Sequence, residues 1–311
     1  MRARAGYSPE AGSSARAALR SSAVAAVTLA AAFALAASVR AQDDGAPPER
    51  VSFPSADGHT TLTGYVYKPR AGAGSRVPAV VMMHGRSGAY SSKAAGRYDA
   101  STLSLRHKMW GRFWAAQGYV ALLVDDFGPR GYPSGFPAHS YKQRPADVNE
   151  VTVRPLDAYG ALAYLRGRPD VAADRIGLLG WSNGGSATLA AMAEDSPGLP
   201  ARGGGFRAAL AFYPACRLHD QFTAGLKPYA PVRVFHGTAD EETSPRRCEQ
   251  LIERSRAKGD IAIVLYPGAT HGFDNPADNR QSNAANAAAK ADAMARAQKF
   301  FAERLGGGTA R

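Results

Sequence analysis

The sequence predicts an α/β fold built on a mostly parallel sheet, and three observations carry this prediction. Near-continuous apolar runs such as residues 78–84 and 119–125 are typical of strands buried on both faces. Segments with helical spacing alternate with these runs along the chain. The sequence Gly180-Trp181-Ser182-Asn183-Gly184 joins one apolar run to a stretch of small residues and good helix formers. We therefore expect one core, with no second domain and no large cap.

The individual elements follow from the same patterns. Residues 51–53 and 62–68 alternate apolar and polar side chains around the turn-rich stretch 56–59, which predicts an antiparallel hairpin at the sheet edge. The remaining strands are expected over residues 78–84, 119–125, 175–179, 208–213, 232–236 and 261–266. Helices are expected over residues 109–117, 153–165, 185–193, 245–258 and 284–305.

The composition is that of an ordinary globular protein. The 311 residues are 45% hydrophobic and 21% charged, which is enough apolar material for a full core. The net charge is +12, and the five arginines and one glutamate of residues 1–41 account for four of those charges. The other charges are scattered rather than clustered as in a nucleic-acid footprint. We expect a solvated basic surface and no nucleic-acid partner.

The N-terminus has the pattern of a secretory signal. A basic region through Arg20 precedes an apolar stretch at 23–37, and Val39-Arg40-Ala41 fits the small-x-small rule for cleavage before Gln42. We expect a signal peptide at residues 1–41, a mature domain at 42–311, and a secreted or periplasmic protein with no membrane contact after cleavage. The alternative is an uncleaved anchor, although the apolar run is short for a membrane-spanning helix.

The chain has two cysteines, Cys216 and Cys248. In an oxidising compartment, two cysteines are enough for one disulfide and leave no thiol over. Two separate buried thiols are the alternative, and the sequence leaves both possibilities open.

Ser182 is the candidate nucleophile. A strand that turns sharply through G-x-S-x-G into a helix is a nucleophile elbow, and it exposes the serine hydroxyl at the top of the sheet. Glycines two positions either side of the serine are needed because a Cβ there would collide with neighbouring elements. The N–H groups that begin the helix point at the same place. The alternative is an ordinary Gly/Ser turn between a strand and a helix.

A serine nucleophile needs a base and an acid, and in this arrangement the order along the chain is Ser, acid, His. His271 lies in a turn just after the last predicted strand, at the edge where open α/β sheets bind ligands. Asp240 follows strand 232–236 and is the expected acid. The alternatives are a surface-loop histidine and a helix-capping aspartate.

Other residues compete for these two roles. Glu241 and Glu242 are adjacent competitors for the acid, and His219 and His236 are the other histidines after Ser182. His236 ends a predicted strand, and His219 precedes the best acid, so neither fits as well as His271.

The oxyanion formed in such a reaction needs two N–H donors. One is expected from the main chain of Asn183, directly after the nucleophile. The other is expected from Arg86, in the loop after the first buried strand. His84, beside this loop, is expected to be packed at the strand end, and a catalytic role is the alternative.

The loop at 127–144 leaves a strand at its carboxyl end and is expected to line the substrate pocket. Phe127 and Tyr132, with Phe136, are candidates for contact with an acyl or aromatic group. Arg130 either binds a substrate carboxylate or stabilises the loop. No Cys/His cluster, H-E-x-x-H motif or phosphate-binding Gly-Lys loop occurs, so neither a metal nor a cofactor is expected.

These segments together resemble the dienelactone hydrolase family of the α/β-hydrolase superfamily, over most of residues 50–305. The motifs that carry the resemblance are Met83-His84-Gly85-Arg86-Ser87-Gly88, Asp125-Asp126-Phe127-Gly128-Pro129-Arg130-Gly131, Gly180-Trp181-Ser182-Asn183-Gly184-Gly185, Gly237-Thr238-Ala239-Asp240 and His271-Gly272-Phe273. The resemblance implies an α/β-hydrolase fold, a triad of Ser182, Asp240 and His271, and oxyanion donors at Arg86 and Asn183.

The chain departs from the founding members of that family at two positions. Those enzymes use a cysteine nucleophile controlled by a glutamate, whereas this chain has Ser182 and, at the glutamate position, Gly85. The Gly-Trp-Ser-x-Gly-Gly elbow also resembles that of secreted cutinase-like polyester hydrolases.

The resulting hypothesis is a serine hydrolase that cleaves small-molecule carboxylic esters or lactones through an acyl-enzyme. The alternatives are a peptidase or acyltransferase with the same triad, and a non-catalytic binding protein on a hydrolase fold. The sequence leaves the oligomeric state open.

Overall fold

Within the residues that the computed structural model describes (46–70, 76–201, 204–216 and 222–306), eight strands form one sheet. The compact unit that carries this sheet begins at Pro47. The strands in chain order are β1 (Glu49–Pro54), β2 (Thr61–Tyr67), β3 (Val77–Met83), β4 (Val120–Asp125), β5 (Val171–Trp181), β6 (Ala209–Phe212), β7 (Val232–Gly237) and β8 (Ile261–Tyr266). Their order across the sheet is β1-β2-β4-β3-β5-β6-β7-β8.

The sheet is antiparallel only at one edge. β1 and β2 form the predicted hairpin, with Phe53 paired to Leu62, and β2 pairs antiparallel with β4. All pairs from β4 to β8 are parallel. The central strands are almost wholly buried because helices cover both faces, which is why they have continuous apolar runs rather than alternating ones.

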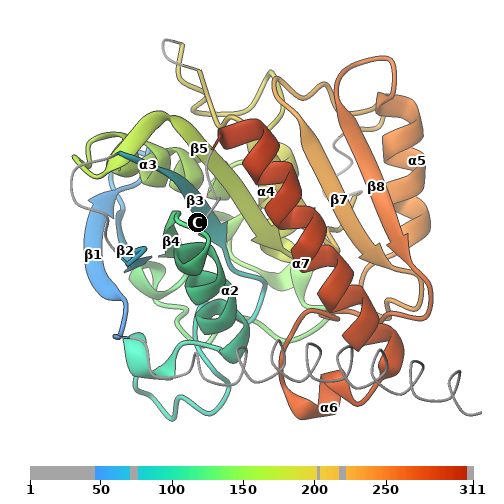
Figure 1. The fold of residues 1–311 in the computed structure, drawn as a ribbon, viewed down its shortest axis with the longest axis horizontal. Coiled ribbons are helices and arrows are strands. Elements are labelled where there is room, and N and C mark those ends of the chain that lie inside the picture. Colours follow the sequence, from blue (N-terminus) through green and yellow to red (C-terminus); the bar gives the residue numbers. More distant parts are fainter. Residues whose placement is uncertain (1–45, 71–75, 202–203, 217–221, 307–311) are drawn as a thin grey trace, which may run out of the picture. The chain divides into compact units, whose positions relative to one another are not determined.

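The helices divide between the two faces of the sheet. They are α2 (Leu105–Ala116), α3 (Arg154–Arg166), α4 (Asn183–Ala191), α5 (Pro245–Ser255), α6 (Asp278–Gln281) and α7 (Ala284–Leu305). Side chains of α3, α4 and α5 belong to one apolar core, and those of α2 and α7 belong to the other. Figure 1 shows α2 and α7 lying in front of the sheet. The predicted α/β fold, with a mostly parallel sheet flanked by helices, is confirmed.

Two elements differ from their predicted bounds. Helix α2 begins at Leu105 rather than at residue 109, because the Ser104 hydroxyl accepts a hydrogen bond from the His107 N–H at 3.4 Å and caps an extra turn. Strand β5 starts at Val171 and is longer than the predicted 175–179, since Val171 also pairs with Val77 of β3, before an irregularity in the register.

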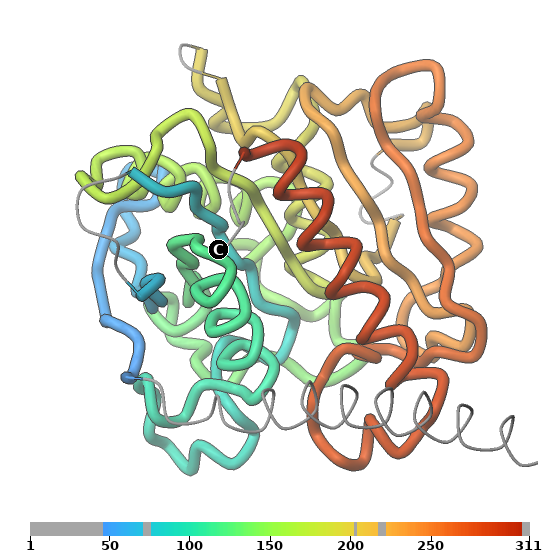
Figure 2. Tube along the Cα trace, viewed as in Figure 1, coloured from blue at the N-terminus to red at the C-terminus, as the bar shows by residue number. Residues whose placement is uncertain are grey.

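The parallel strands bring distant parts of the chain to one edge of the sheet. Trp181 pairs with Phe212, Phe212 pairs with Phe235, and Gly237 pairs with Tyr266. The segments that follow β5, β7 and β8 therefore leave the sheet at the same edge, as the trace in Figure 2 shows. This edge is where the sequence places its candidate site.

In the part of the chain that the structure describes, no helix combines the length and the apolar character needed to cross a membrane. The signal peptide expected at residues 1–41 lies outside the described residues and stays a prediction.

Candidate active site

Ser182 occupies a strained turn between β5 and α4. Its backbone has φ 53° and ψ −115°, a region that residues other than glycine rarely adopt. Two hydrogen bonds hold the turn: the Ser182 N–H donates to the Phe212 carbonyl at 2.9 Å, and the Ser182 carbonyl accepts from the Ser186 N–H at 2.9 Å. The strand before the turn and the helix after it are both buried, so the surrounding packing fixes this conformation.

The flanking glycines are required by close approach. A Cβ on Gly180 would overlap the carbonyl oxygen of Gly184 and the hydroxyl of Thr188. A Cβ on Gly184 would overlap the carbonyl oxygens of Met83 and His84 at the end of β3. The G-x-S-x-G pattern therefore reflects direct packing of α4 against β5 and against the end of β3.

Ser182, His271 and Asp240 come together at the edge of the sheet. His271 Nε2 lies 3.0 Å from Ser182 Oγ. His271 Nδ1 lies 2.9 Å and 3.0 Å from the two carboxylate oxygens of Asp240. The ring is thus connected to the hydroxyl on one side and to the carboxylate on the other, as base catalysis by a Ser–His–Asp set requires.

The Asp240 carboxylate is held in place by its own loop. Its Oδ1 accepts hydrogen bonds from the N–H groups of Glu242 and Thr243, and its Oδ2 accepts from the Thr243 hydroxyl at 2.9 Å. Burial raises the pKa of Asp240, but the hydrogen bonds from His236, His271 and Thr243 outweigh it and keep that pKa well below the ordinary range. The carboxylate is therefore ionised at neutral pH, as orienting an imidazole requires.

The competing acids have other partners. Glu241 Oε2 accepts a hydrogen bond from the His271 main-chain N–H at 2.9 Å. Glu242 forms a bidentate ion pair with Arg86 at 2.7 Å and 2.8 Å, and its Oε2 lies 3.7 Å from His271 Nε2. Neither lies against Nδ1, so only Asp240 has the position of the orienting acid.

The competing histidines also lie elsewhere. His236 is fully buried behind the acid, with its Nε2 3.2 Å from Asp240 Oδ2. His219 lies outside the described residues. Of the described histidines that follow Ser182, His271 is the one whose ring meets its hydroxyl.

The two expected oxyanion donors lie on segments that border Ser182. Asn183 is the first residue of α4, so its N–H has no acceptor within the helix. The loop that carries Arg86 passes beside the nucleophile, because a Cβ on the adjacent Gly85 would lie 3.5 Å from Ser182 Cβ and 3.3 Å from the Trp181 carbonyl. The glycine therefore lets this main chain approach the nucleophile closely.

A fully buried ionic cluster lies beneath these two segments, and sequence reasoning missed it. Arg154 Nε contacts Asp126 Oδ2 at 2.6 Å, while its other nitrogens donate to the His84 carbonyl and to Asn183 Oδ1. His84 Nε2 lies 2.7 Å from Asp126 Oδ1. Burial raises the pKa of Asp126, but Arg154 and His84 outweigh it and lower that pKa. The cluster ties the loop after β3 to the start of α4.

Two of the predicted substrate-binding residues have structural contacts instead. Phe127 is fully buried, and its ring packs edge-on against His84 at 4.5 Å between centroids. Arg130 binds the carboxylates of Asp57 and Asp157 at 2.9 Å and the Asp126 carbonyl at 2.8 Å. Of the two alternatives for Arg130, these contacts match loop stabilisation.

Tyr132 is partly exposed in the same loop. Its N–H donates to the Phe127 carbonyl, and its ring lies 5.3 Å from that of Phe136. Phe136 in turn bonds through its N–H to the Arg86 carbonyl at 2.8 Å. These two aromatic side chains therefore border the loop expected to supply an oxyanion donor.

A second unpredicted group supports the His271 turn. Asp274 is fully buried and accepts hydrogen bonds from Tyr213 at 2.6 Å and Trp110 at 2.8 Å. The Tyr213 ring packs edge-on against His271 at 4.7 Å between centroids. The only signal in the sequence was the position of Asp274, three residues after His271, and its partners lie far away along the chain.

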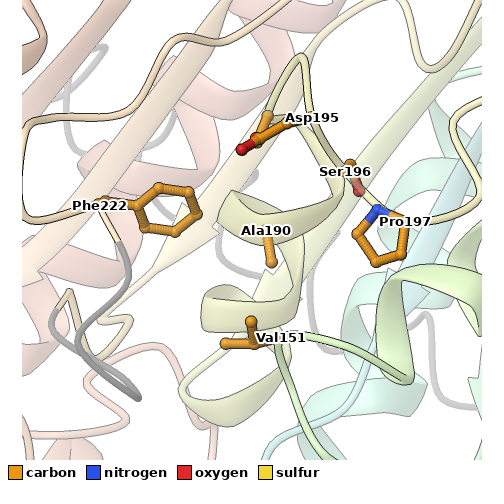
Figure 3. A pocket seen from close by; sticks show the side chains of 7 residues that line it. Val151, Ala190, Asp195, Ser196, Pro197 and Phe222 are labelled. Carbon is orange, nitrogen blue, oxygen red and sulfur yellow. The ribbon is translucent and has the colours of Figure 1, made fainter.

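A cavity of about 150 Å³ lies at the other end of α4. Figure 3 shows its lining, which comprises Val151, Ala190, Ala193, Asp195, Ser196, Pro197 and Phe222. Because Ser182 precedes the first residue of α4 and Ala190 lies near its last, the helix separates the two by roughly 12 Å. This cavity is not the space in front of the candidate triad.

Cys216 and Cys248 form a disulfide that joins the segment after β6 to α5. This outcome decides between the bridge and the two separate thiols. Cys248 lies in the first turns of the helix that follows the acid loop, so the bridge connects that region to the strand beside the nucleophile.

The chain is similar to several known proteins. Residues 62–305 match the profile of the dienelactone hydrolase family. Human dipeptidyl peptidase 8 is 30% identical over 156 residues, which is 49% of this chain but only 16% of that protein.

Two solved structures are similar in fold. A dienelactone hydrolase-like promiscuous phosphotriesterase from metagenomic libraries has a TM-score of 0.63 and 22% identity, over 83% of this chain and 98% of its own. Thermogutta terrifontis esterase 2 has a TM-score of 0.59 and 22% identity, over 85% and 97% of the respective chains. With a family match over most of its length and the fold of that family, the chain belongs to the dienelactone hydrolase family of α/β-hydrolases.

Proposed function

We propose that the protein is a serine hydrolase that cleaves small-molecule carboxylic esters or lactones through an acyl-enzyme. The observation that carries the proposal is the continuous chain of contacts from Ser182 through His271 to Asp240. The hydrolase family and the esterase among the similar structures support the same chemistry.

In the acylation step, His271 Nε2 takes the proton of Ser182 as the hydroxyl oxygen attacks the ester carbonyl. The N–H groups of Asn183 and Arg86 bind the oxyanion that develops. His271 then gives the proton to the departing alcohol, which leaves the acyl group on the serine. Asp240 stays ionised and fixes the imidazole orientation throughout.

In the deacylation step, water takes the place of the serine hydroxyl. His271 removes a proton from the water, whose oxygen attacks the acyl carbon. When the tetrahedral intermediate collapses, the proton returns to Ser182 Oγ and the acid is released.

The first test is Ser182→Ala. We expect the variant to lose the burst of p-nitrophenol from p-nitrophenyl acetate and to lose labelling by a fluorophosphonate probe. Turnover should fall by about 10⁴-fold or more, because the nucleophile is absent. Ser282→Ala, which removes an exposed serine hydroxyl after α6, is the matched control and should behave as the unaltered protein does. Full turnover by Ser182→Ala would show that the nucleophile is assigned wrongly.

A second candidate is peptide-bond hydrolysis by the same residues, which the match to a dipeptidyl peptidase favours. Comparison of kcat/KM for an ester and an amide with the same acyl group separates the two. We expect the ester to be preferred, and a larger kcat/KM for the amide would favour the peptidase.

We also propose export of the protein, on the basis of the leader pattern in residues 1–41. The mass of the mature protein tests this, since cleavage after Ala41 leaves Gln42 as the first residue.

A further inference from the structure

Three consecutive acidic residues contact His271 in three different ways. Asp240 binds Nδ1, and Glu241 accepts a hydrogen bond from the main-chain N–H. Glu242 lies on the other side of the ring, with Oε2 3.7 Å from Nε2. The Ser–His–Asp set accounts for the first contact, and the turn that carries His271 accounts for the second. Neither explains the third contact, between Glu242 and Nε2.

Glu242 is held firmly beside that nitrogen. The Arg86 guanidinium binds both of its carboxylate oxygens, at 2.7 Å and 2.8 Å, and donates a further hydrogen bond to the Phe136 carbonyl at 3.1 Å. The Glu242 main-chain N–H donates to Asp240 at 2.9 Å. The carboxylate is thus fixed from both ends, by the loop after β3 and by the acid loop.

Glu242 is also an acceptor at neutral pH. Burial raises the pKa of its carboxyl group, but the hydrogen bonds from Arg86 and the adjacent His271 outweigh burial, and the pKa lies below its ordinary range. The side chain is 16% exposed, so its oxygens remain within reach of water.

The distances match the requirements of one water molecule. His271 Nε2 is 3.0 Å from Ser182 Oγ and 3.7 Å from Glu242 Oε2. Because His271 Nε2 and Glu242 Oε2 are 3.7 Å apart, both can accept hydrogen bonds of about 2.8 Å from the two hydrogens of a single water. With both hydrogens engaged, the lone pairs of that water are directed away from the two acceptors.

We propose that Glu242 orients the hydrolytic water during deacylation, with Arg86 as the residue that positions it. This inference rests on the proposed function. The water gives one proton to His271 Nε2 and a hydrogen bond to Glu242 Oε2, while its oxygen forms a bond to the acyl carbon. The carbonyl electron pair moves to the oxyanion, collapse breaks the bond to Ser182 Oγ, and the proton on His271 passes to that oxygen. Glu242 neither gains nor loses a proton.

Acylation has no such need. There the proton passes directly from Ser182 Oγ to Nε2, and no water has to be placed. The charged imidazole forms in both steps, so an electrostatic effect of the Glu242–Arg86 pair on the ring acts on acylation and deacylation alike. Loss of the carboxylate should therefore slow deacylation much more than acylation.

The test is Glu242→Gln in the full chain, with p-nitrophenyl acetate as the probe. Stopped-flow measurement of the burst gives the acylation rate, and the decay of the acetyl-enzyme measured by intact mass gives the deacylation rate. We expect deacylation to fall about 10- to 100-fold, because a neutral amide replaces the charged acceptor of the water's hydrogen bond, and acylation to fall less than about 5-fold. The matched control is Glu253→Gln, which makes the same change on the exposed face of α5 and should alter neither rate.

A second measurement does not depend on water. Hydroxylamine attacks acyl-enzymes with little need for base catalysis, so it should release the acetyl group from Glu242→Gln nearly as fast as from the unaltered protein. Labelling by the fluorophosphonate probe at the unaltered rate would show that the variant is folded and acylates.

Two outcomes would overturn the proposal. One is deacylation at the unaltered rate in Glu242→Gln, and the other is an equal fall in acylation and deacylation. Failure of the proposed function looks different, since the unaltered protein would then show neither a burst nor labelling.

Discussion

Two of the His–Asp contacts at this edge of the sheet, one in the proposed triad and one in the buried ionic cluster, differ in their surroundings. His271 Nδ1 lies 2.9 Å from Asp240, and His84 Nε2 lies 2.7 Å from Asp126. In both pairs the histidine and the aspartate come from segments that follow parallel strands. The spacing between imidazole and carboxylate therefore does not separate the pair proposed to be catalytic from the pair inside the buried cluster.

The third partner of each pair makes the difference. The other nitrogen of His271 faces the Ser182 hydroxyl at 3.0 Å, and the His271 side chain is 9% exposed. The other nitrogen of His84 lies 2.8 Å from the Gly85 carbonyl, and its side chain is completely buried. Asp126 is moreover shared with Arg154. In the first pair the second nitrogen faces a hydroxyl, whereas both nitrogens of His84 have buried partners, one on Gly85 after β3 and one on Asp126 after β4.

The largest effect that tests this comparison is expected from replacing His271 and His84, one at a time, with glutamine. His271→Gln should lower kcat/KM for an ester by about 10⁴-fold or more, because the base is lost, with little change in Tm. His84→Gln should lower Tm and leave a folded protein that still labels with a fluorophosphonate. Thermal denaturation and ester kinetics on both variants measure this. A His84→Gln variant with unchanged Tm and no activity would contradict the structural role of His84.

A smaller effect, on stability, is expected from the buried ionic cluster. Arg154→Met leaves the Asp126 carboxylate buried without its guanidinium partner. Asp126→Asn leaves the Arg154 guanidinium buried without its carboxylate partner. Each should lower the free energy of unfolding by about 3–5 kcal/mol. The double variant should lose clearly less than the sum of the two, since the unpaired charge is then absent. Urea denaturation of all four proteins in the cycle measures the coupling, and additive losses would contradict an ion pair that acts as a unit.

The smallest effect concerns acid stability, to which the Asp240 pair contributes. The pKa of Asp240 is lower in the folded protein than in the unfolded chain, so its contribution to stability is present above the unfolded pKa of about 4. As the pH falls below that value, the unfolded chain takes up the proton first and the contribution is lost. Urea midpoints measured between about pH 5 and pH 3 should therefore fall less steeply for Asp240→Asn than for the unaltered protein. Equal slopes would show that the pair adds nothing to acid stability.

The sequence predicted the parts of the site that depend on position along a strand. Ser182, Asp240 and His271 each follow a recognisable apolar run, and parallel strands bring their carboxyl ends to one edge, so their convergence could be expected before any coordinates. The hairpin and the closing helix at 284–305 were also predictable, because hydrophobic periodicity and a glycine stop define them.

The buried contacts could not be predicted in this way. Arg154 meets partners 28, 29 and 70 residues away along the chain, and nothing in the local pattern distinguishes it from a surface arginine at a helix start. For the same reason, the sequence alone does not decide between the two roles of Arg130. The pairing of Glu242 with Arg86 spans 156 residues, so the adjacent acids after Asp240 could not be told apart by sequence alone.

The bridge between Cys216 and Cys248 has a consequence for how the protein is made. Because the chain has no other cysteine, oxidation within one molecule has a single possible product, and shuffling among wrong partners cannot occur. A preparation can therefore be checked by counting thiols: a fully oxidised sample has none to titrate, and each reduced molecule contributes two.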